Sequence, residues 1–100
     1  MLFRSIIPFL PGAIEYSEQD AIPGGLKNNR EFVSCAVRFA ATVAPEIENL
    51  LYDPQTSGGL LISVAPEAAE ALADELRVAG VPASVVGGVR AREAYAIVVH

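Results

Sequence analysis

The residues Asp53-Pro54-Gln55-Thr56-Ser57-Gly58-Gly59 lead directly into the apolar run Leu60-Leu61-Ile62-Ser63-Val64. This run has the length and composition of a buried strand. Asp53 precedes a proline, which disfavours the helical conformation, so the chain should enter the loop extended. Gly58 and Gly59 lack a Cβ and would let a ligand or another backbone segment approach closely. We therefore predict a strand over residues 60–64, with a polar loop at its start.

Two interpretations of this loop fit its residues. Asp-Pro and Ser-Gly-Gly are common turn sequences, and most such clusters only connect two elements. An anion site is the alternative, because the hydroxyls of Thr56 and Ser57 stand beside several backbone N–H groups. Phosphate-binding loops, however, usually lead into a helix, whose N-terminus attracts the anion. Since these glycines lead into a strand, the residues alone favour the structural turn.

The wider sequence resembles the signature of a known family. Residues 49–62, NLLYDPQTSGGLLI, closely resemble part of the C-terminal domain of the selenide, water dikinases, also called selenophosphate synthetases. Residues 8–13 (PFLPGA), 21–25 (AIPGG) and 85–89 (VVGGV) resemble other parts of the same domain. The resemblance covers nearly the whole chain. It implies the fold of the aminoimidazole ribonucleotide synthetase-like superfamily.

The resemblance also implies an activity. Members of this family use ATP to make selenophosphate from selenide for selenocysteine and selenouridine formation, and they release AMP and phosphate. Their N-terminal domain carries most of the ATP and Mg²⁺ site, the dimer contacts and the reactive cysteine or selenocysteine. We expect residues 1–100 to form a single domain, the C-terminal domain or a fragment of such an enzyme, inactive alone. The expected partners are the N-terminal domain and, in the full-length enzyme, a second copy.

The resemblance further implies that two loops of this domain close the active-site cleft. We expect one loop at residues 24–29 and the other at residues 53–59. Leu26 stands where the family carries threonine, and Asn28 where it carries arginine, so a polar role is not transferred to either position. No catalytic residue, metal ligand or tightly bound cofactor is expected in this chain. The candidate cleft residues are Gly24, Gly25, Asn29, Asp53, Gln55, Thr56, Ser57, Gly58 and Gly59.

The composition restricts the class of protein. A chain of 100 residues with 52% hydrophobic content suits one globular domain. The net charge of −5 and the isoelectric point near 4.7 argue against nucleic acid and anionic membranes as partners. One cysteine cannot form an internal disulfide, so a reducing, cytoplasmic setting fits. No segment approaches the roughly 20 apolar residues of a membrane span.

The pattern of apolar and turn residues predicts a mixed α+β domain, in which helices pack on one face of a sheet. In the first half we expect an extended or strand lead-in over residues 5–10 and a helix over 13–20. A loop should follow over 21–30, and one or two short strands over 31–40. Cys35 lies among apolar residues in the last of these segments, and we expect it to be buried.

The second half alternates helices and strands. Proline near the first turn predicts a short helix over 45–51. The clearest helix covers 66–79, with glutamates near its start and a glycine and a proline after its end. Strands are expected over 83–89 and 94–99, paired as an antiparallel hairpin. The helix should bury an apolar stripe of Ala65, Ala68, Ala69, Leu72, Leu76 and Ala79.

Two other functions stay open on the sequence. One is a non-catalytic α+β module that binds a metabolite or a partner protein, as many domains of this size do. The other is an ATP-dependent synthetase of the same superfamily with another substrate. Genomic sequence upstream of Met1 would distinguish the dikinase from these alternatives. A glycine-rich segment with a reactive cysteine or selenocysteine and a nearby lysine would support the dikinase.

Overall fold

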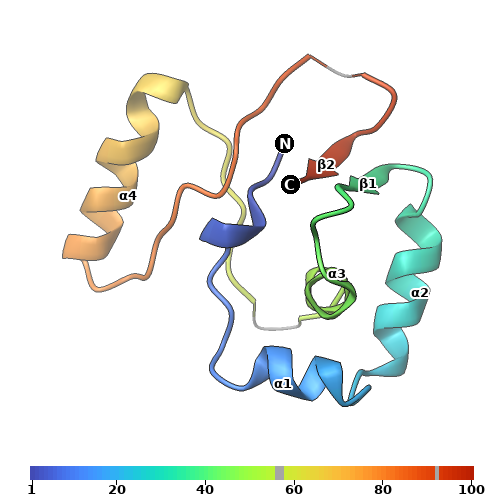
Figure 1. The fold of residues 1–100 in the computed structure, drawn as a ribbon. Coiled ribbons are helices and arrows are strands. Elements are labelled where there is room, and N and C mark those ends of the chain that lie inside the picture. The colour runs from blue at the N-terminus through green and yellow to red at the C-terminus, as the bar shows by residue number, and fades with distance from the viewer. Residues whose placement is uncertain (56–57, 92) are drawn as a thin grey trace.

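The computed structural model describes residues 1–55, 58–91 and 93–100. Helices and a small parallel sheet make up the described fold, so the predicted mixed α+β class is confirmed (Figure 1). In chain order the elements are η1 (Arg4–Ile6), α1 (Ala13–Glu18), α2 (Gly24–Val33), β1 (Val37–Phe39), α3 (Pro45–Leu51), η2 (Pro66–Ala68), α4 (Ala69–Val78) and β2 (Ile97–Val99), where η marks a 3-10 helix.

The sheet joins distant parts of the chain. β1 and β2 pair in parallel, with Val37 opposite Ile97 and Phe39 opposite Val99. Leu2 continues the pairing on the far side of β2, because its N–H donates to Val98 O at 2.8 Å and its carbonyl accepts from His100 N at 3.0 Å. Both chain ends therefore lie beside the sheet (Figure 1). The predicted antiparallel hairpin is wrong, since the partner of β2 is β1.

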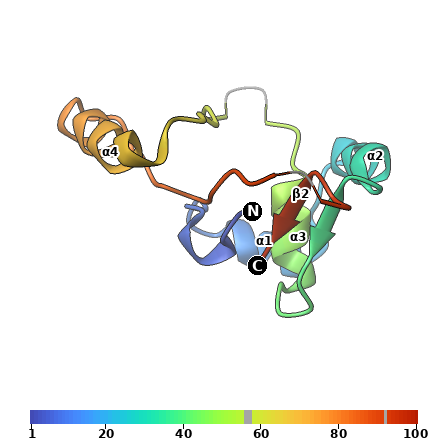
Figure 2. The ribbon, with the colours of Figure 1, turned by 90° about the horizontal axis from the view of Figure 1, so that it is seen from above.

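The core forms where α3 packs on this sheet. Its buried centre consists of Val43, Ile47 and Val99, and Phe39 and Leu51 are among the half-buried side chains around it. Helix α1 packs against α3 from the outside, and their contact is partly polar. Ser17 of α1 is buried, and its hydroxyl donates to Glu46 O of α3 at 3.0 Å. Helix α4 stands apart from the sheet in both ribbon views (Figure 1, Figure 2), so only part of the predicted helical layer covers it.

The helices with strong local signals occur where the sequence predicted them. Helix α3 has the predicted bounds, with Pro45 in its first turn. Residues 66–78 are helical as η2 and α4, and α1 falls within the helix predicted over 13–20. Gly80 ends α4 in the left-handed conformation, with φ +79°. The N–H of Val81 then donates to Leu76 O at 2.8 Å. This bond spans five residues and is typical of a helix that ends at a glycine.

The apolar stripe of α4 is less buried than predicted. Ala73 is the buried residue of the helix, and Ala69, Leu72 and Leu76 are half-buried. Ala65, Ala68 and Ala79 are exposed, which corrects the prediction for the two ends of the stripe. Both ends of the stripe are exposed because α4 lies away from the other helices and is joined to them only by irregular segments (Figure 2).

Of the loop predicted over residues 21–30, residues 21–23 are irregular as expected, but residues 24–30 are helical. From Gly24 onward they form α2, preceded by Pro23 in an extended conformation with φ −71° and ψ 149°. Two glycines at the start argue against a helix, but they lie in its first turn, where few backbone bonds depend on them. Leu26 is only 2% exposed and anchors the helix. Burial has therefore overridden a poor local propensity.

Several predicted strands are absent or shorter. Residues 60–64 make no strand and are exposed, with Leu60 at 89%. Residues 83–89 contribute a bridge between Gly87 and Leu2, and Phe3 N donates to Val86 O at 2.9 Å. The lead-in predicted over 5–10 begins inside η1, and the strands predicted over 31–40 and 94–99 shrink to β1 and β2.

Cys35 is exposed, so its predicted burial is wrong. It lies in the turn between α2 and β1 and not within a strand. None of the helices in the described part of the chain combines the length and the apolar character that crossing a bilayer requires.

Candidate functional site

Helix α2 brings the two candidate segments into contact. Gly25 and Asn29 are four positions apart and so lie on one face of the helix. A Cβ added to Gly25 would be 3.0 Å from Cγ of Pro54, so the proline ring sits directly over this glycine. Asn29 donates its Nδ2 hydrogen to Tyr52 O at 2.9 Å. Helix α2 therefore contacts the chain on both sides of Asp53.

Arg30 adds a polar cluster next to this contact. Its Nη2 donates to Asn49 Oδ1 at 2.9 Å and lies 3.6 Å from Glu48 Oε2. Its guanidinium carbon lies 5.2 Å from the centre of the Tyr52 ring, which is a cation–π distance. All three partners belong to the C-terminal half of α3 or follow it directly. Arg30 therefore ties α2 to the end of α3.

Tyr52 links this cluster to the core. Its ring meets the Phe39 ring edge-on, with centroids 5.6 Å apart. Burial raises the pKa of the Tyr52 hydroxyl, and it outweighs the positive charge of Arg30, which lowers that pKa; Glu48 raises it further. The hydroxyl therefore stays neutral well above physiological pH.

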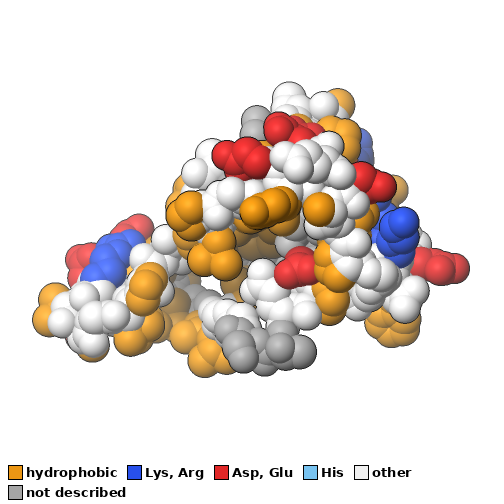
Figure 3. Space-filling model, turned by 90° about the horizontal axis from the view of Figure 1, so that it is seen from below, with side chains coloured by type: hydrophobic (Ala, Val, Ile, Leu, Met, Phe, Trp, Pro, Cys, Tyr) orange, Lys and Arg blue, Asp and Glu red, His pale blue; other side chains and the backbone are white. Residues whose placement is uncertain are grey.

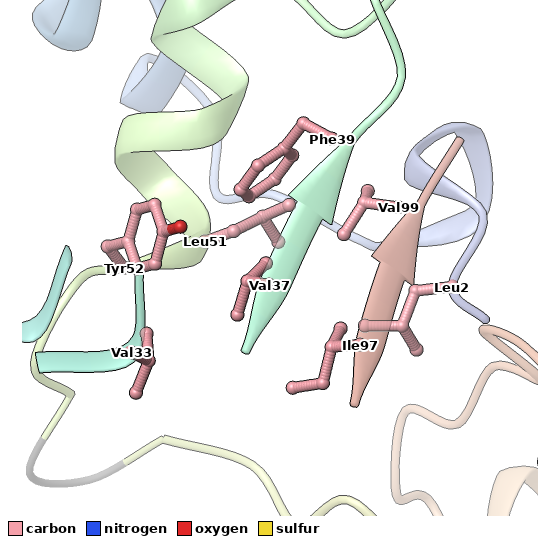
Figure 4. Close-up of a pocket in the computed structure, with 8 residues that line it drawn as sticks. All are labelled: Leu2, Val33, Val37, Phe39, Leu51, Tyr52, Ile97 and Val99. Carbon is pink, nitrogen blue, oxygen red and sulfur yellow. The ribbon is translucent and has the colours of Figure 1, made fainter. Parts of the chain in front are cut away.

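A small apolar cavity of about 150 Å³ lies between the sheet and Tyr52 (Figure 4). Side chains from β1, β2, α2 and the end of α3 surround it. They offer packing and one phenol, so this cavity has no groups for phosphoryl transfer among its lining residues. The lining consists of Leu2, Val33, Val37, Phe39, Leu51, Tyr52, Ile97 and Val99.

The Asp53 segment starts from the last turn of α3. Tyr52 N donates to Asn49 O at 3.0 Å and Asp53 N to Leu50 O at 3.3 Å. Gln55 N then donates to Asp53 O at 3.0 Å. A Cβ on Gly58 would lie 2.6 Å from Oε1 and 2.9 Å from Cβ of Gln55, so the Gln55 side chain occupies the space that this glycine leaves.

A larger hollow of about 860 Å³ opens beside this segment. Seen from below, hydrophobic side chains gather around a depression in the molecule (Figure 3). Asp53, Gln55, Gly58 and Gly59 line the hollow, opposite residues 7–10 of the N-terminal segment. Four of the candidate residues are therefore brought together at one surface feature.

The other candidates lie elsewhere. Gly25 and Asn29 contact the Asp53 segment from α2 but do not line the hollow, and Gly24 has open space beside its Cα. Thr56 and Ser57 lie outside the described residues. Sequence reasoning did not include Arg30, Asn49 and Tyr52 among the site residues. The last two fall within the NLLYDPQTSGG string, which is the signal that could have identified them.

Mg²⁺ binds to proteins mainly through carboxylate oxygens. Over residues 1–55, 58–91 and 93–100, no three side chains among His, Cys, Asp and Glu are grouped so that they could hold a metal ion. Asp53 stands without a second carboxylate in the lining of the hollow. The described residues therefore hold no metal site built from three such side chains, and the hollow offers a metal ion the Asp53 carboxylate alone among them.

Comparison with known proteins gives the family. No protein-family model matches the chain. It is 47% identical over 82 residues to a selenide, water dikinase of Pelobacter propionicus, covering 82% of this chain and 24% of that protein. The chain belongs to the selenide, water dikinase family. A family member from Clostridioides difficile is 40% identical over 84 residues, covering 83% of this chain and 24% of the relative.

A third dikinase relative shows the same partial coverage. Selenide, water dikinase 2 of Peptoclostridium acidaminophilum is 42% identical over 94 residues, covering 93% of this chain and 27% of that protein. The chain thus spans about a quarter of the length of the dikinases it matches. The resemblance seen in residues 49–62 is confirmed.

Proposed function

We propose that this chain serves as the C-terminal domain of a selenide, water dikinase, which forms selenophosphate from selenide and ATP and releases AMP and phosphate. The observation that carries the proposal is identity of 40–47% to proteins of that name over more than four fifths of the chain. The contact between α2 and the Asp53 segment supports it, because it joins the two segments that the family resemblance assigns to the cleft.

The domain's role in the proposal is to close the active-site cleft. Asp53, Gln55, Gly58 and Gly59 line the hollow, where the Gln55 amide and backbone N–H groups can donate hydrogen bonds to an anionic substrate. Gly25 and Asn29 of α2 contact Pro54 and Tyr52, on either side of Asp53, and Gly24 stays a candidate on the resemblance alone. Thr56 and Ser57 stay candidates on the sequence alone.

In this proposal, the rest of the enzyme supplies the ATP and Mg²⁺ site. ATP and Mg²⁺ are held mainly by the N-terminal domain, as the resemblance to the family implies. The partners are that domain and, in the full-length enzyme, a second copy. The net charge of −5 argues against nucleic acid and membrane surfaces. A single cysteine fits a cytoplasmic setting.

The proposal is tested in a full-length dikinase that carries this domain. Gln55→Ala removes a side chain that lines the hollow, while Gln19→Ala removes an exposed glutamine at the end of α1 as a matched control. We expect selenide-dependent AMP release to fall at least tenfold in the first variant and to stay unchanged in the second. Equal activity in both variants, with equal melting temperatures, would remove the Asp53 segment from the cleft.

A further inference from the structure

The position of Asp53 depends on the last turn of α3. The N–H groups of Tyr52 and Asp53 both bond to carbonyls of that turn. Helix α3 has only seven residues, and helices this short are marginal without external support. Its last turn also has no basic residue of its own to favour the negative end of the helix dipole. Something outside α3 must therefore hold this turn.

Arg30 provides that support through three contacts of its guanidinium group, two of which are made by Nη2. Nη2 donates a hydrogen bond to Asn49 and forms an ion pair with Glu48, and the guanidinium carbon lies over the Tyr52 ring, 5.2 Å from its centre. Only the planar, always charged group of arginine combines these three contacts, since the lysine ammonium is a compact point charge. The Arg30 cation also lies at the C-terminal half of α3, where positive charge stabilises the helix.

We propose that Arg30 is a positioning residue that fixes the end of α3 and, through it, Asp53 and Gln55. The consequence for catalysis rests on the proposed function of this domain. Two neighbouring residues of α2 also hold this segment: Asn29 donates a hydrogen bond to Tyr52 O, and Gly25 leaves room for the Pro54 ring to pack against the helix. Helix α2 thus holds the segment on both sides of Asp53.

Arg30 is assigned to positioning and not to substrate binding for an electrostatic reason. Its Nη2 already lies 3.6 Å from the Glu48 carboxylate, and its guanidinium carbon lies 5.2 Å from the centre of the Tyr52 ring. It also does not line the hollow that Asp53 and Gln55 border. Its effect on a bound anion would therefore act through α3.

The first arm of the test measures local opening in the 100-residue chain. Amide hydrogen exchange is followed at Tyr52 and Asp53, whose N–H groups bond to the last turn of α3. Arg30→Met keeps most of the side-chain length but removes the charge and the plane, and Arg30→Lys restores the charge alone. We expect exchange to be at least tenfold faster in Arg30→Met and intermediate in Arg30→Lys, with amides of β2 unchanged.

The matched control is Arg38→Met. Arg38 also makes a cation–π contact, 5.8 Å from the centre of the Tyr95 ring, but it belongs to β1 and not to the contact between α2 and α3. We expect this variant to leave exchange at Tyr52 and Asp53 unchanged. If Arg30→Met lowers the global stability too far for local exchange to be resolved, Arg30→Lys against Arg38→Lys gives the same comparison.

The second arm measures activity in a full-length dikinase that carries the domain. We expect Arg30→Met to lower kcat for selenide-dependent AMP release at least tenfold, Arg30→Lys to recover part of it, and Arg38→Met to leave it unchanged. Unchanged exchange at Tyr52 and Asp53 in Arg30→Met overturns the positioning role, whatever the activity. Faster exchange with unchanged kcat upholds that role and overturns the proposed place of Asp53 and Gln55 in the cleft.

Discussion

Helix α2 depends on one buried side chain, and replacing it is the sharpest test of the fold around the site. Leu26 is 2% exposed, whereas Phe32 on the same helix is 87% exposed. Leu26→Ala removes buried methyl groups and leaves a cavity, a change that typically costs about 2–5 kcal/mol. Phe32→Ala removes a larger apolar side chain from solvent, so its cost should stay within about 0.5 kcal/mol.

The expected difference is large for a domain of this size. A loss of 1 kcal/mol lowers the melting temperature by about 4–8 °C in a domain of 60–100 residues. A middle value of about 3 kcal/mol for Leu26→Ala therefore predicts a decrease of roughly 12–24 °C. Phe32→Ala should shift the melting temperature by no more than about 4 °C.

The assay is thermal unfolding followed by circular dichroism, with urea unfolding as a second measure. Side-chain hydrophobicity alone would rank the two variants the other way, because phenylalanine is the larger residue. Equal losses in both variants, or a larger loss in Phe32→Ala, would refute the burial of Leu26 and the helical assignment of residues 24–33. A large loss in Leu26→Ala alone supports both.

Four further predictions concern α4, Tyr52, the Asp53 loop and the isolated chain. Leu72→Ala should cost about 1 kcal/mol and Glu70→Ala less than about 0.5 kcal/mol in urea unfolding, because Leu72 is only half-buried. Stability should fall as pH rises above about 10, because the pKa of the Tyr52 hydroxyl is raised in the folded state and the unfolded state loses this proton at a lower pH. Urea midpoints in Tyr52→Phe should lack this part of the pH dependence. In a full-length dikinase, Thr56→Val should lower turnover at nearly constant melting temperature, while Gly58→Ala should lower both by displacing the Gln55 side chain; unchanged turnover in the first and a folding defect alone in the second would favour a structural turn. The purified 100-residue chain should show no selenide-dependent AMP release, and detection of such release would contradict the assignment of phosphate-binding groups to the rest of the enzyme.

The helices were predictable where their own residues define the ends. Pro45 fits the first turn of α3, and Gly80 stops α4 by adopting a positive φ, and both effects are local. Helix α2 was missed because its glycines are poor helix formers. What stabilises it is the burial of Leu26 and the bonds of Asn29 and Arg30 to a helix that comes later in the chain.

The strands were less predictable because pairing is not local. β1 joins β2 from the other end of the chain, and Leu2 adds to the same sheet, a combination that apolar alternation does not encode. The apolar run at 60–64 has the composition of a strand but finds no pairing partner among the described residues. Composition predicted the strand-forming tendency, and tertiary contacts decided which segments paired.

The candidate site was predictable in part. The family-like string led to Asp53, Gln55, Gly58 and Gly59, which border one hollow. It did not lead to Arg30, because the residues that Arg30 contacts become its neighbours only when α2 and α3 pack together. The spacing of residues along the sequence does not reveal a positioning contact of this kind, because it forms only in the folded chain.

The exposed segment at 60–64 has a consequence for how the chain can be divided. Proteases bind accessible, irregular backbone, so cleavage between Leu60 and Leu61 is expected. Such a cut would place β1 in one fragment and β2 in the other, although the two strands pair in parallel. Leu2 in the first fragment also bonds to Val98 and His100 in the second. The halves should therefore stay associated after cleavage, which makes this peptide bond a natural position for a split-protein reporter reassembled from two pieces.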